Sequence, residues 1–288
     1  MTATPHTTTA LPTPQSLVQQ LQADLPQFKQ IEWFERTSST NANLLTKART
    51  NEYQLARPWL VGAHLQDEGR GRAGRTWQNR AGANLMFSCA FDIFLPQHLL
   101  PSLSPVAGIA ACEALRSFLD AEQRNHLTMK WPNDLLWKSA KLAGILVETT
   151  RAGTSRLSAD HYVAIMGIGI NLDDARALSQ SLNRQVADWG EIAAGSPEAA
   201  RTPIHALVSA VAQAWYDATT MLMRQGFEPF PVRHAHLDAL AGQHVNVLDD
   251  GRIVNAGIAC GINMLGQLVV RTPNGAVPIT VGEVSVRT

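Results

Sequence analysis

A nine-residue segment of this 288-residue chain concentrates groups that can hold an anion. Residues 69–77 read Gly-Arg-Gly-Arg-Ala-Gly-Arg-Thr-Trp, so glycine and arginine interleave before a tryptophan. Glycine lets the backbone approach a ligand closely, and the forked guanidinium of arginine suits phosphate and carboxylate oxygens. The 24 basic side chains are balanced by 24 acidic ones, so any attraction for an anion has to be local. The segment therefore predicts a loop that binds an anionic ligand.

The same glycines also satisfy a dinucleotide-binding pattern. Gly69, Gly71 and Gly74 spell G-x-G-x-x-G, and Asp92 lies near the distance at which a ribose-binding acid is expected. That pattern needs an apolar helix directly after the glycines, whereas residues 75–82 are mostly polar, which disfavours this interpretation. The sequence has no Gly-Lys-Ser/Thr phosphate loop, and its neutral charge disfavours an arginine–glycine tail for nucleic acid. A solvated turn with incidental arginines is the remaining alternative.

Two lysine-containing segments carry further chemistry. Residues 130–134 read Lys-Trp-Pro-Asn-Asp, and residues 141–148 read Lys-Leu-Ala-Gly-Ile-Leu-Val-Glu. Asn-Asp after a proline is good turn chemistry, but a turn does not explain a lysine on either side of it. Asp134 could hold Mg²⁺ or act as a base, and an exposed turn aspartate is the alternative.

Two weaker signals complete the set. Residues 167–171 read Gly-Ile-Gly-Ile-Asn, and glycines inside an apolar strand indicate a bulge or a close backbone approach. Asn171 ends this strand, where its amide could pair with the edge of adenine. The polar turn Ser39-Thr40-Asn41 is a weaker signal, since such turns often only cap helices. His234 and His236 lack further ligands at zinc spacing, and no G-x-S-x-G motif is present.

These segments need a framework, and the apolar pattern predicts an α+β or α/β arrangement, a mixed sheet covered by helices. Helices are expected at residues 15–25, after the polar turn 37–41 through Arg49, from 104 to about 124, and from 202 to Gly226. Strands are expected at residues 31–34, 59–65, 84–94, 128–131, 135–137, 144–149 and 162–172. After Gly242, short strands separated by turn signals predict a small β-barrel or β-roll that packs on the main domain.

Composition is that of an ordinary soluble globular protein, with 45% apolar and 17% charged residues. Cys89, Cys112 and Cys260 show neither disulfide nor zinc spacing, which indicates a reducing compartment. The sequence has no leader pattern and no apolar run of membrane-spanning length, so we expect a cytoplasmic protein without a membrane partner. We expect a disordered tail at 1–14, a main domain at 15–240 and a small β domain at 241–288.

Taken in order, these segments resemble the biotin protein ligases. The resemblance is carried by the segments at 39–41, 69–77, 130–134, 141–148, 167–171 and by Gly-Glu-Val-Ser-Val-Arg at 282–287. It implies a catalytic domain related to class II aminoacyl-tRNA synthetases, followed by a small SH3-like β-barrel. Two positions depart from the family pattern. Ala73 stands where many members carry arginine, so arginine cannot be essential there, and Asp67-Glu68 make the loop entrance unusually acidic.

The resemblance also implies an activity: ATP-dependent attachment of biotin, through biotinyl-5′-AMP, to a lysine of a biotin carboxyl carrier protein. ATP and Mg²⁺ would be required. The catalytic residues would be Lys141, Arg72, Arg75 and Asp134, with Asp134 also the candidate Mg²⁺ ligand. The biotin-binding residues would be Ser39, Thr40, Asn41, Gln66, Arg70, Gly71, Arg72, Lys141 and Gly144. The nucleotide-binding residues would be Trp77, Lys130, Asn133 and Asn171.

Family members that also repress transcription carry an N-terminal winged helix. Too few residues precede the Ser-Thr-Asn turn for that domain, so we expect no DNA partner. The oligomeric state stays open, with a homodimer as one option. Two other functions stay in view: a lipoate–protein ligase of the same superfamily, and a nucleotide-binding protein without catalytic activity.

Overall fold

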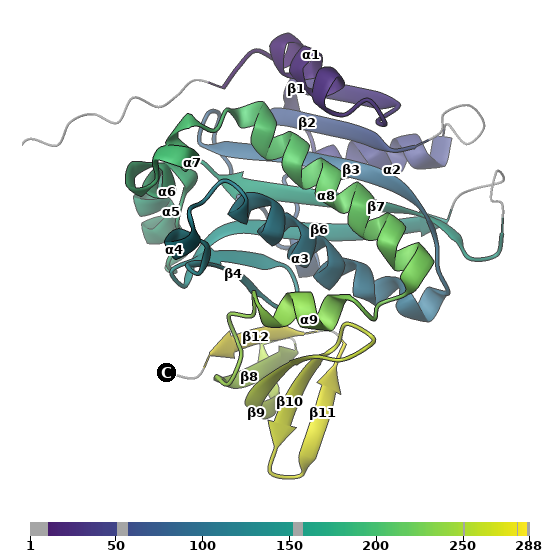
Figure 1. The fold of residues 1–288 in the computed structure, drawn as a ribbon, viewed down its shortest axis with the longest axis vertical. Coiled ribbons are helices and arrows are strands. Elements are labelled where there is room, and N and C mark those ends of the chain that lie inside the picture. The colour runs from purple at the N-terminus through teal and green to yellow at the C-terminus, as the bar shows by residue number, and fades with distance from the viewer. Residues whose placement is uncertain (1–10, 51–56, 152–157, 250, 281, 287–288) are drawn as a thin grey trace, which may run out of the picture.

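The computed structural model describes residues 11–50, 57–151, 158–249, 251–280 and 282–286. They form a large α+β part and a smaller all-β part, which lies below it in Figure 1. The predicted tail falls mostly on residues 1–10, outside the described ranges. Helix α1, Pro14–Asp24, begins at the last residue of that predicted tail, and the Thr13 hydroxyl accepts a hydrogen bond from the Ser16 N–H.

The main sheet has seven strands in the order β1-β2-β3-β7-β6-β5-β4. The bounds are β1 Gln30–Thr37, β2 Trp59–Gln66, β3 Asn84–Phe94, β4 Leu127–Lys130, β5 Asp134–Trp137, β6 Ala140–Arg151 and β7 His161–Asn171. Only β1 and β2 run parallel, and the other neighbours are antiparallel. β7 lies at the centre, where it pairs with β3 on one side and β6 on the other. Its glycines therefore sit on a backbone held from both sides.

The two faces of this sheet bury separate cores, because successive side chains of a strand point to opposite sides. On one face, α1, α3 (Leu103–Arg116) and α8 (Ile204–Gln225) cover residues such as Phe87 and Met166. On the other face, Leu44 and Ala48 of α2 (Thr40–Thr50) pack on Trp59. Figure 1 shows α3 and α8 crossing the near face of the sheet. The amino end of α2 is thereby set against the far face, close to β2, β3 and β6.

Most predicted elements are confirmed to within a few residues. β3 has the predicted bounds, and α8 ends before Gly226, which has a φ of 71°. The prediction of one helix running to about residue 124 is wrong. α3 ends at Arg116, and a separate helix α4 (Ala121–Arg124) begins because the Asp120 carboxylate caps it by accepting from the Gln123 N–H at 2.8 Å. The pattern missed α5 (Ala175–Leu182), α6 (Trp189–Gly195), α7 (Pro197–Arg201) and α9 (Phe230–Ala235).

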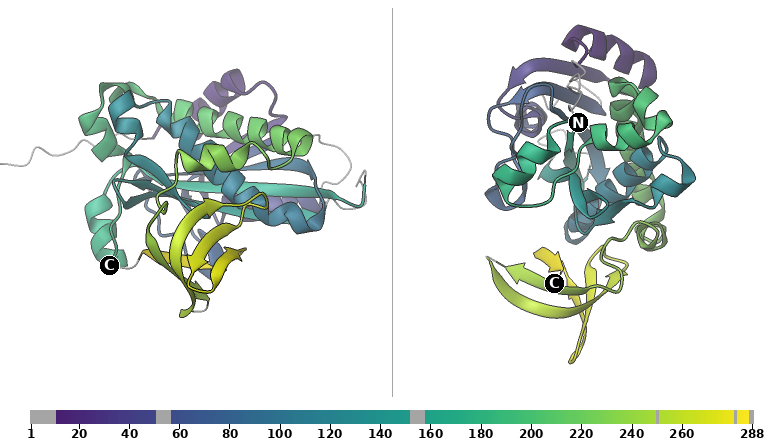
Figure 2. Two further views of the ribbon diagram at one scale, coloured as in Figure 1. Left: turned by 60° about the horizontal axis from the view of Figure 1, so that its bottom comes forward. Right: turned by 90° about the vertical axis from the view of Figure 1, so that its left-hand side faces the viewer.

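The small part is a five-stranded antiparallel sheet in the order β11-β10-β9-β8-β12. The bounds are β8 His244–Asp249, β9 Arg252–Ile262, β10 Leu268–Thr272, β11 Gly275–Ile279 and β12 Glu283–Val286. It packs on the main domain as predicted: Trp131 is buried in its core and donates its indole N–H to the carbonyl of Gly266 at 3.0 Å. Figure 2 shows it as a distinct lobe. In the described residues β11 and β12 are the sheet's two edges, so closure into a barrel stays a prediction.

One helical stretch, residues 97–116, is long and apolar enough to cross a membrane by composition alone. It consists of a 3₁₀ segment, Gln97–Ser102, and α3. Most of α3 is buried between α8 and the sheet, with Val106, Ile109 and Leu115 in the core. Packing inside the domain accounts for its apolar character.

Candidate active site

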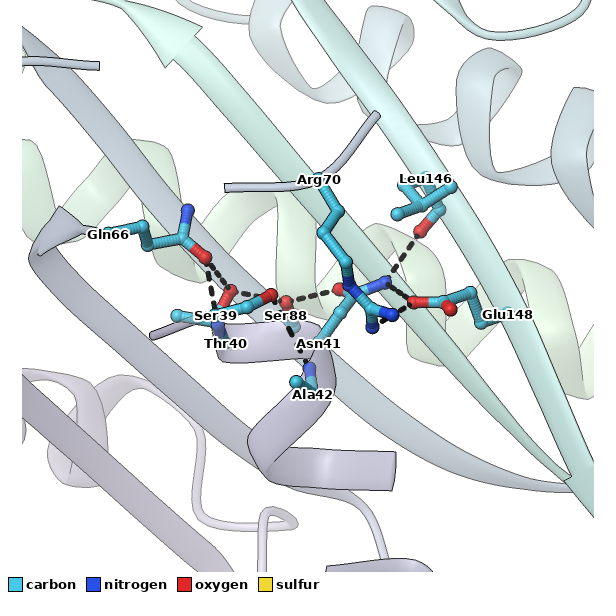
Figure 3. Close-up of polar contacts among 9 residues, drawn as sticks. All are labelled: Ser39, Thr40, Asn41, Ala42, Gln66, Arg70, Ser88, Leu146 and Glu148. Atoms are coloured by element: carbon cyan, nitrogen blue, oxygen red, sulfur yellow. Dashed lines mark hydrogen bonds and ion pairs between the residues drawn. The ribbon is translucent and has the colours of Figure 1, made fainter. Parts of the chain in front are cut away.

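A chain of hydrogen bonds lies between the amino end of α2 and the sheet (Figure 3). The Thr40 N–H donates to Gln66 Oε1 at 2.8 Å, and the Thr40 hydroxyl lies 2.7 Å from that of Ser88. The Ser88 hydroxyl donates to Asn41 Oδ1 at 2.6 Å. The Asn41 amide then donates to Glu148 Oε2 at 2.8 Å. Segments far apart in the sequence are joined into one polar surface.

The direction of these bonds is fixed by counting protons. Ser88 has one hydroxyl proton and gives it to Asn41, so the Thr40 hydroxyl donates to Ser88 at 2.7 Å, and its longer contact with Gln66 Oε1 at 3.3 Å shares the same proton. Thr40, Asn41 and Ser88 are 3%, 4% and 0% exposed, so each polar group has to be satisfied inside the protein. Ser39 is also buried and lies 3.5 Å from the Ala42 N–H. The surface suits an uncharged ligand head group that both donates and accepts hydrogen bonds.

The Gly/Arg loop at 69–77 folds back on itself. The Gly71 N–H donates to the carbonyl of Arg75 at 2.6 Å, and the Trp77 N–H donates to that of Gly69 at 2.8 Å. Between them, residues 72–74 form a short 3₁₀ turn in which Ala73 has a φ of 52°. These bonds give the loop a defined shape and direct its side chains toward the sheet and toward β12.

Each arginine of the loop has a polar partner. Arg70 donates to Glu148 at 2.8 Å, at the end of the hydrogen-bond chain described above. Arg72 donates to Asn133 Oδ1 at 3.0 Å and to the carbonyl of Gly282 at 3.3 Å, and burial lowers its pKa. Arg75 forms a two-pronged ion pair with Glu283, whose pKa the guanidinium lowers. The small domain thus contacts the loop at two adjacent residues.

Lys141 begins the other half of the site. Its ammonium lies 2.6 Å from Asp134 Oδ1, across the β5–β6 pair, and 5.8 Å from the centre of the Trp77 ring system. Burial lowers the pKa of Lys141, and the charge of Asp134 opposes that shift. The charges of Arg184 and Lys130 lower the same pKa further.

Glycines form the floor beneath these side chains. A Cβ on Gly169 would lie 2.4 Å from Trp77 Cε2, and one on Gly144 would lie 3.1 Å from both Trp77 and Lys141. A Cβ on Gly167 would lie 2.1 Å from Asn41 Oδ1. The two glycines of β7 therefore make room for the two halves of the site, with Asn41 over one and Trp77 over the other.

The two asparagines predicted to bind the nucleotide have structural partners. Asn133 accepts from Arg72 and donates to the carbonyl of Ile145 at 2.7 Å. Asn171 donates to the carbonyls of Lys141 and Ala187 at 3.2 and 3.1 Å and accepts from Asn84 at 3.1 Å. Both amide protons of Asn171 are used in this way. Pairing of either residue with adenine stays a prediction, and the contacts seen position Arg72 and Lys141.

A pocket opens between Trp77 and α5. It is lined by Thr76, Trp77, Gln78, Lys141, Asn171, Leu178, Leu182, Arg184 and Val186. Trp77 supplies an aromatic face, two leucines supply apolar contacts, and Lys141 and Arg184 supply positive charge. Its cavity volume is only about 30 Å³, so it is the lining chemistry, an aromatic and apolar wall beside cations, and not the size that suits a nucleotide.

Sequence reasoning missed several of these residues. Ser88 is a polar residue between apolar neighbours of β3, and that interruption was its only signal. Glu148 closes the Lys141–Glu148 segment, but no spacing rule connects it to Asn41, 107 positions away. Leu178, Leu182 and Arg184 lie on α5 or just after it, and the pattern did not predict that helix.

Together the fold and the site define a class: an α+β protein with a neutral polar subsite and a cationic, aromatic-walled subsite on one sheet. Comparison with known sequences is consistent with such a two-subsite α+β protein. Residues 33–171 match the biotin/lipoate A/B protein ligase family, and residues 241–287 match the biotin protein ligase C-terminal domain. A biotin–[acetyl-CoA-carboxylase] ligase of Paracoccus denitrificans is 33% identical over 259 residues, which is 86% of this chain and 97% of that protein.

The bifunctional ligase/repressor BirA of Escherichia coli (strain K12) is 31% identical over 226 residues, 78% of this chain. The match spans 65% of BirA, just under two-thirds of its length. A biotin protein ligase from Aquifex aeolicus in complex with biotin and ATP is similar in structure, with a TM-score of 0.68 and 26% identity. The match covers 90% of this chain and 99% of that one. The chain belongs to the biotin protein ligase family, and both the predicted family and the α+β fold are confirmed.

Proposed function

We propose that this protein joins biotin to a lysine of a carrier domain of a biotin-dependent carboxylase, through biotinyl-5′-AMP made from ATP. One observation carries the proposal. Gly167 and Gly169 lie two residues apart on β7, and they make room for Asn41 in the neutral polar subsite and for Trp77 in the cationic subsite. A ligand in one subsite would therefore meet a ligand in the other directly above this strand.

The neutral polar subsite would hold the ureido ring of biotin. A ureido group donates two N–H bonds and accepts at its carbonyl, so it needs partners of both kinds. Ser39, Thr40, Asn41 and Gln66 would supply them by exchanging bonds of this network for bonds to the ligand, and the backbone of Gly71 would border the same subsite. Arg70 would act through Glu148, which it shares with Asn41. The buried, pre-bonded network reduces the ordering cost of binding.

The cationic subsite would bring the biotin carboxylate to ATP. A carboxylate oxygen attacks the α-phosphorus, the bond from that phosphorus to the bridging oxygen breaks, and pyrophosphate leaves. Two anions approach each other in this step, so fixed positive charge lowers the barrier. Lys141, whose side chain is 16% exposed, lies beside Gly144 at the junction of the subsites and would contact both reacting groups. Arg72 and Arg75 would add positive charge from the loop, and Lys130 from the end of β4.

Magnesium enters this scheme with ATP. No cluster of three or more carboxylate, histidine or cysteine side chains occurs in the described residues, and Asp134 offers a single carboxylate already bonded to Lys141. One carboxylate plus substrate phosphates is an ordinary Mg²⁺ environment in enzymes, so the residues fit the ion. When bound, Mg²⁺ would neutralise part of the phosphate charge. Asp134 would hold the ion, and its bond to Lys141 keeps that ammonium oriented.

The loop would act as a cover over the intermediate. A mixed anhydride hydrolyses when water reaches it, so it has to be sequestered until the carrier arrives. Arg72 and Arg75 reach Asn133, Gly282 and Glu283 and so fasten the loop against both domains. The acceptor lysine then attacks the acyl carbon, AMP leaves and the amine loses a proton. We place this chemistry in the cytoplasm, in line with the free thiols of all three cysteines.

A mass measurement tests the proposal against its alternatives. The protein is incubated with Mg²⁺, ATP, a carrier domain and either biotin or lipoate, and the intact carrier is weighed. We expect a biotin adduct on the carrier, and no lipoyl adduct. A lipoyl adduct would favour the lipoate-ligase alternative, and no adduct with either acid would favour a non-catalytic nucleotide-binding protein. Lys141→Ala should lose pyrophosphate release, whereas Lys138→Ala, an exposed lysine three residues away, should not.

A further inference from the structure

The chain after α5 returns to the site by pairing with Lys141. The helix ends at Leu182, and the next residue, Asn183, has a φ of 47° and turns the chain back. The Lys141 N–H then donates to the carbonyl of Gln185 at 3.1 Å, and the Ala187 N–H donates to the carbonyl of Lys141 at 3.0 Å. Asn171 fastens the same segment by donating to the carbonyl of Ala187. Residues 185–187 therefore form an added edge beside the start of β6.

This pairing determines where the side chain of Arg184 lies. Val186 is directly opposite Lys141, so both side chains are on one face of the pair. Arg184 precedes Val186 by two residues and is on that face too. All three line the pocket beside Trp77. The guanidinium is thus brought to the pocket by backbone bonds and not by its own contacts.

Arg184 differs from the loop arginines in its partners. Arg70, Arg72 and Arg75 are bonded to Glu148, Asn133 and Glu283. Among the described residues Arg184 has no side-chain partner, and it is exposed while lining the pocket. It is near enough to Lys141 for its charge to lower the pKa of that lysine. Two cations in one pocket, one without an acidic partner, leave positive charge available to a ligand.

We propose that Arg184 binds the β- and γ-phosphate oxygens of ATP and holds the pyrophosphate as it leaves. The inference rests on the proposed function and adds a residue to it. Lys141 is the inner cation, beside Gly144, where the α-phosphate has to meet the carboxylate. Arg184 is the outer cation, so it faces the part of the triphosphate that departs to solvent. A forked guanidinium suits two phosphate oxygens at once.

Steady-state and half-reaction kinetics of Arg184→Ala test this assignment. The KM for ATP should rise about tenfold, and inhibition by added pyrophosphate should weaken by a similar factor. The KM for biotin and the rate of biotin transfer from preformed biotinyl-AMP to a carrier should stay at wild-type values. Arg184→Lys should recover part of the loss, since it keeps a charge but not the fork. Arg176→Ala, an exposed arginine of α5 outside the pocket, is the matched control and should behave as wild type.

Three results would overturn the assignment. An unchanged KM for ATP would show that Arg184 does not bind the nucleotide. A matching loss in transfer from preformed biotinyl-AMP would move its contact to the AMP part of the intermediate. If Arg176→Ala weakened ATP and pyrophosphate binding equally, the effect would come only from the net positive charge in and around α5. Failure of the proposed function would look different, because the unaltered protein would then form no biotinyl-AMP.

Discussion

Two alanine substitutions on β7 should separate the two halves of the site. Gly169→Ala puts a methyl group 2.4 Å from Trp77 Cε2, and Gly167→Ala puts one 2.1 Å from Asn41 Oδ1. β7 cannot recede, because β3 and β6 hold it on both sides. The side chain above each glycine therefore has to move. Gly169→Ala should weaken ATP binding, and Gly167→Ala should weaken biotin binding.

The size of each effect follows from the overlap. Ordinary contact begins at 3.4 Å, so the Trp77 indole has to retreat by about 1 Å in Gly169→Ala. Overpacking of this kind costs about 1–3 kcal/mol, which predicts a rise in the KM for ATP of about 5-fold to 150-fold. Trp77 is only half-buried on its loop, so the free protein can relax and should keep its thermal stability. Asn41 is 4% exposed and would lose its bond to Ser88, so Gly167→Ala should also lower the unfolding temperature.

Pyrophosphate release, measured while either ATP or biotin is varied, checks both predictions. Gly195→Ala is the control, since a Cβ there would meet its nearest atom at 3.7 Å. If Gly169→Ala raised the KM for biotin as much as that for ATP, Trp77 would not belong to the nucleotide half. If a folded Gly169→Ala left both constants unchanged, the glycine floor would have no role in either subsite.

Three further predictions concern the charged partners of the site. Glu148→Gln removes the charge that Asn41 and Arg70 share, so the KM for biotin should rise about fivefold while that for ATP stays constant; equal changes in both would contradict the assignment. Asp134 raises the pKa of Lys141. Pyrophosphate release should fall at high pH as this ammonium deprotonates, and in Asp134→Asn that fall should begin at a lower pH. If the pH of the fall did not change, Lys141 would not be the titrating group. Arg72→Gly removes the loop's bonds to Asn133 and Gly282, so biotinyl-AMP should escape and label bystander lysines; labelling still confined to the carrier would refute the loop's role as a cover.

Much of the framework could be predicted because its signals are local. β3 is a mostly apolar strand, and α8 combines a helical period with Gly226 at its end. The end of α3 was predicted too late because Phe118 and Leu119 continue the helical period. Asp120 ends it by capping the next helix, and Asp-x-x-Gln was a readable start signal. Local rules of this kind place elements, and here they placed most of the sheet.

The connections within the site could not be predicted in the same way. The bonds of Asn41 to Ser88 and Glu148 depend on strand order, since the sheet brings β3 and β6 beside α2. α5 is short and carries no proline or capping side chain at its start, where Asp174 has a φ of 73°. Arg184 could be placed only through the backbone pairing of the segment after that helix with Lys141.

The carboxylates paired with the cations of the site affect which anions those cations can bind. Arg70, Arg75 and Lys141 each form an ion pair, with Glu148, Glu283 and Asp134. A phosphate that contacts one of these cations must compete with a carboxylate already in place, which favours a ligand able to engage several cations at once. A triphosphate meets that condition, whereas a lone inorganic anion does not. Arg184 has no such competitor among the described residues. A nucleotide can therefore engage Arg184 without displacing a carboxylate from it.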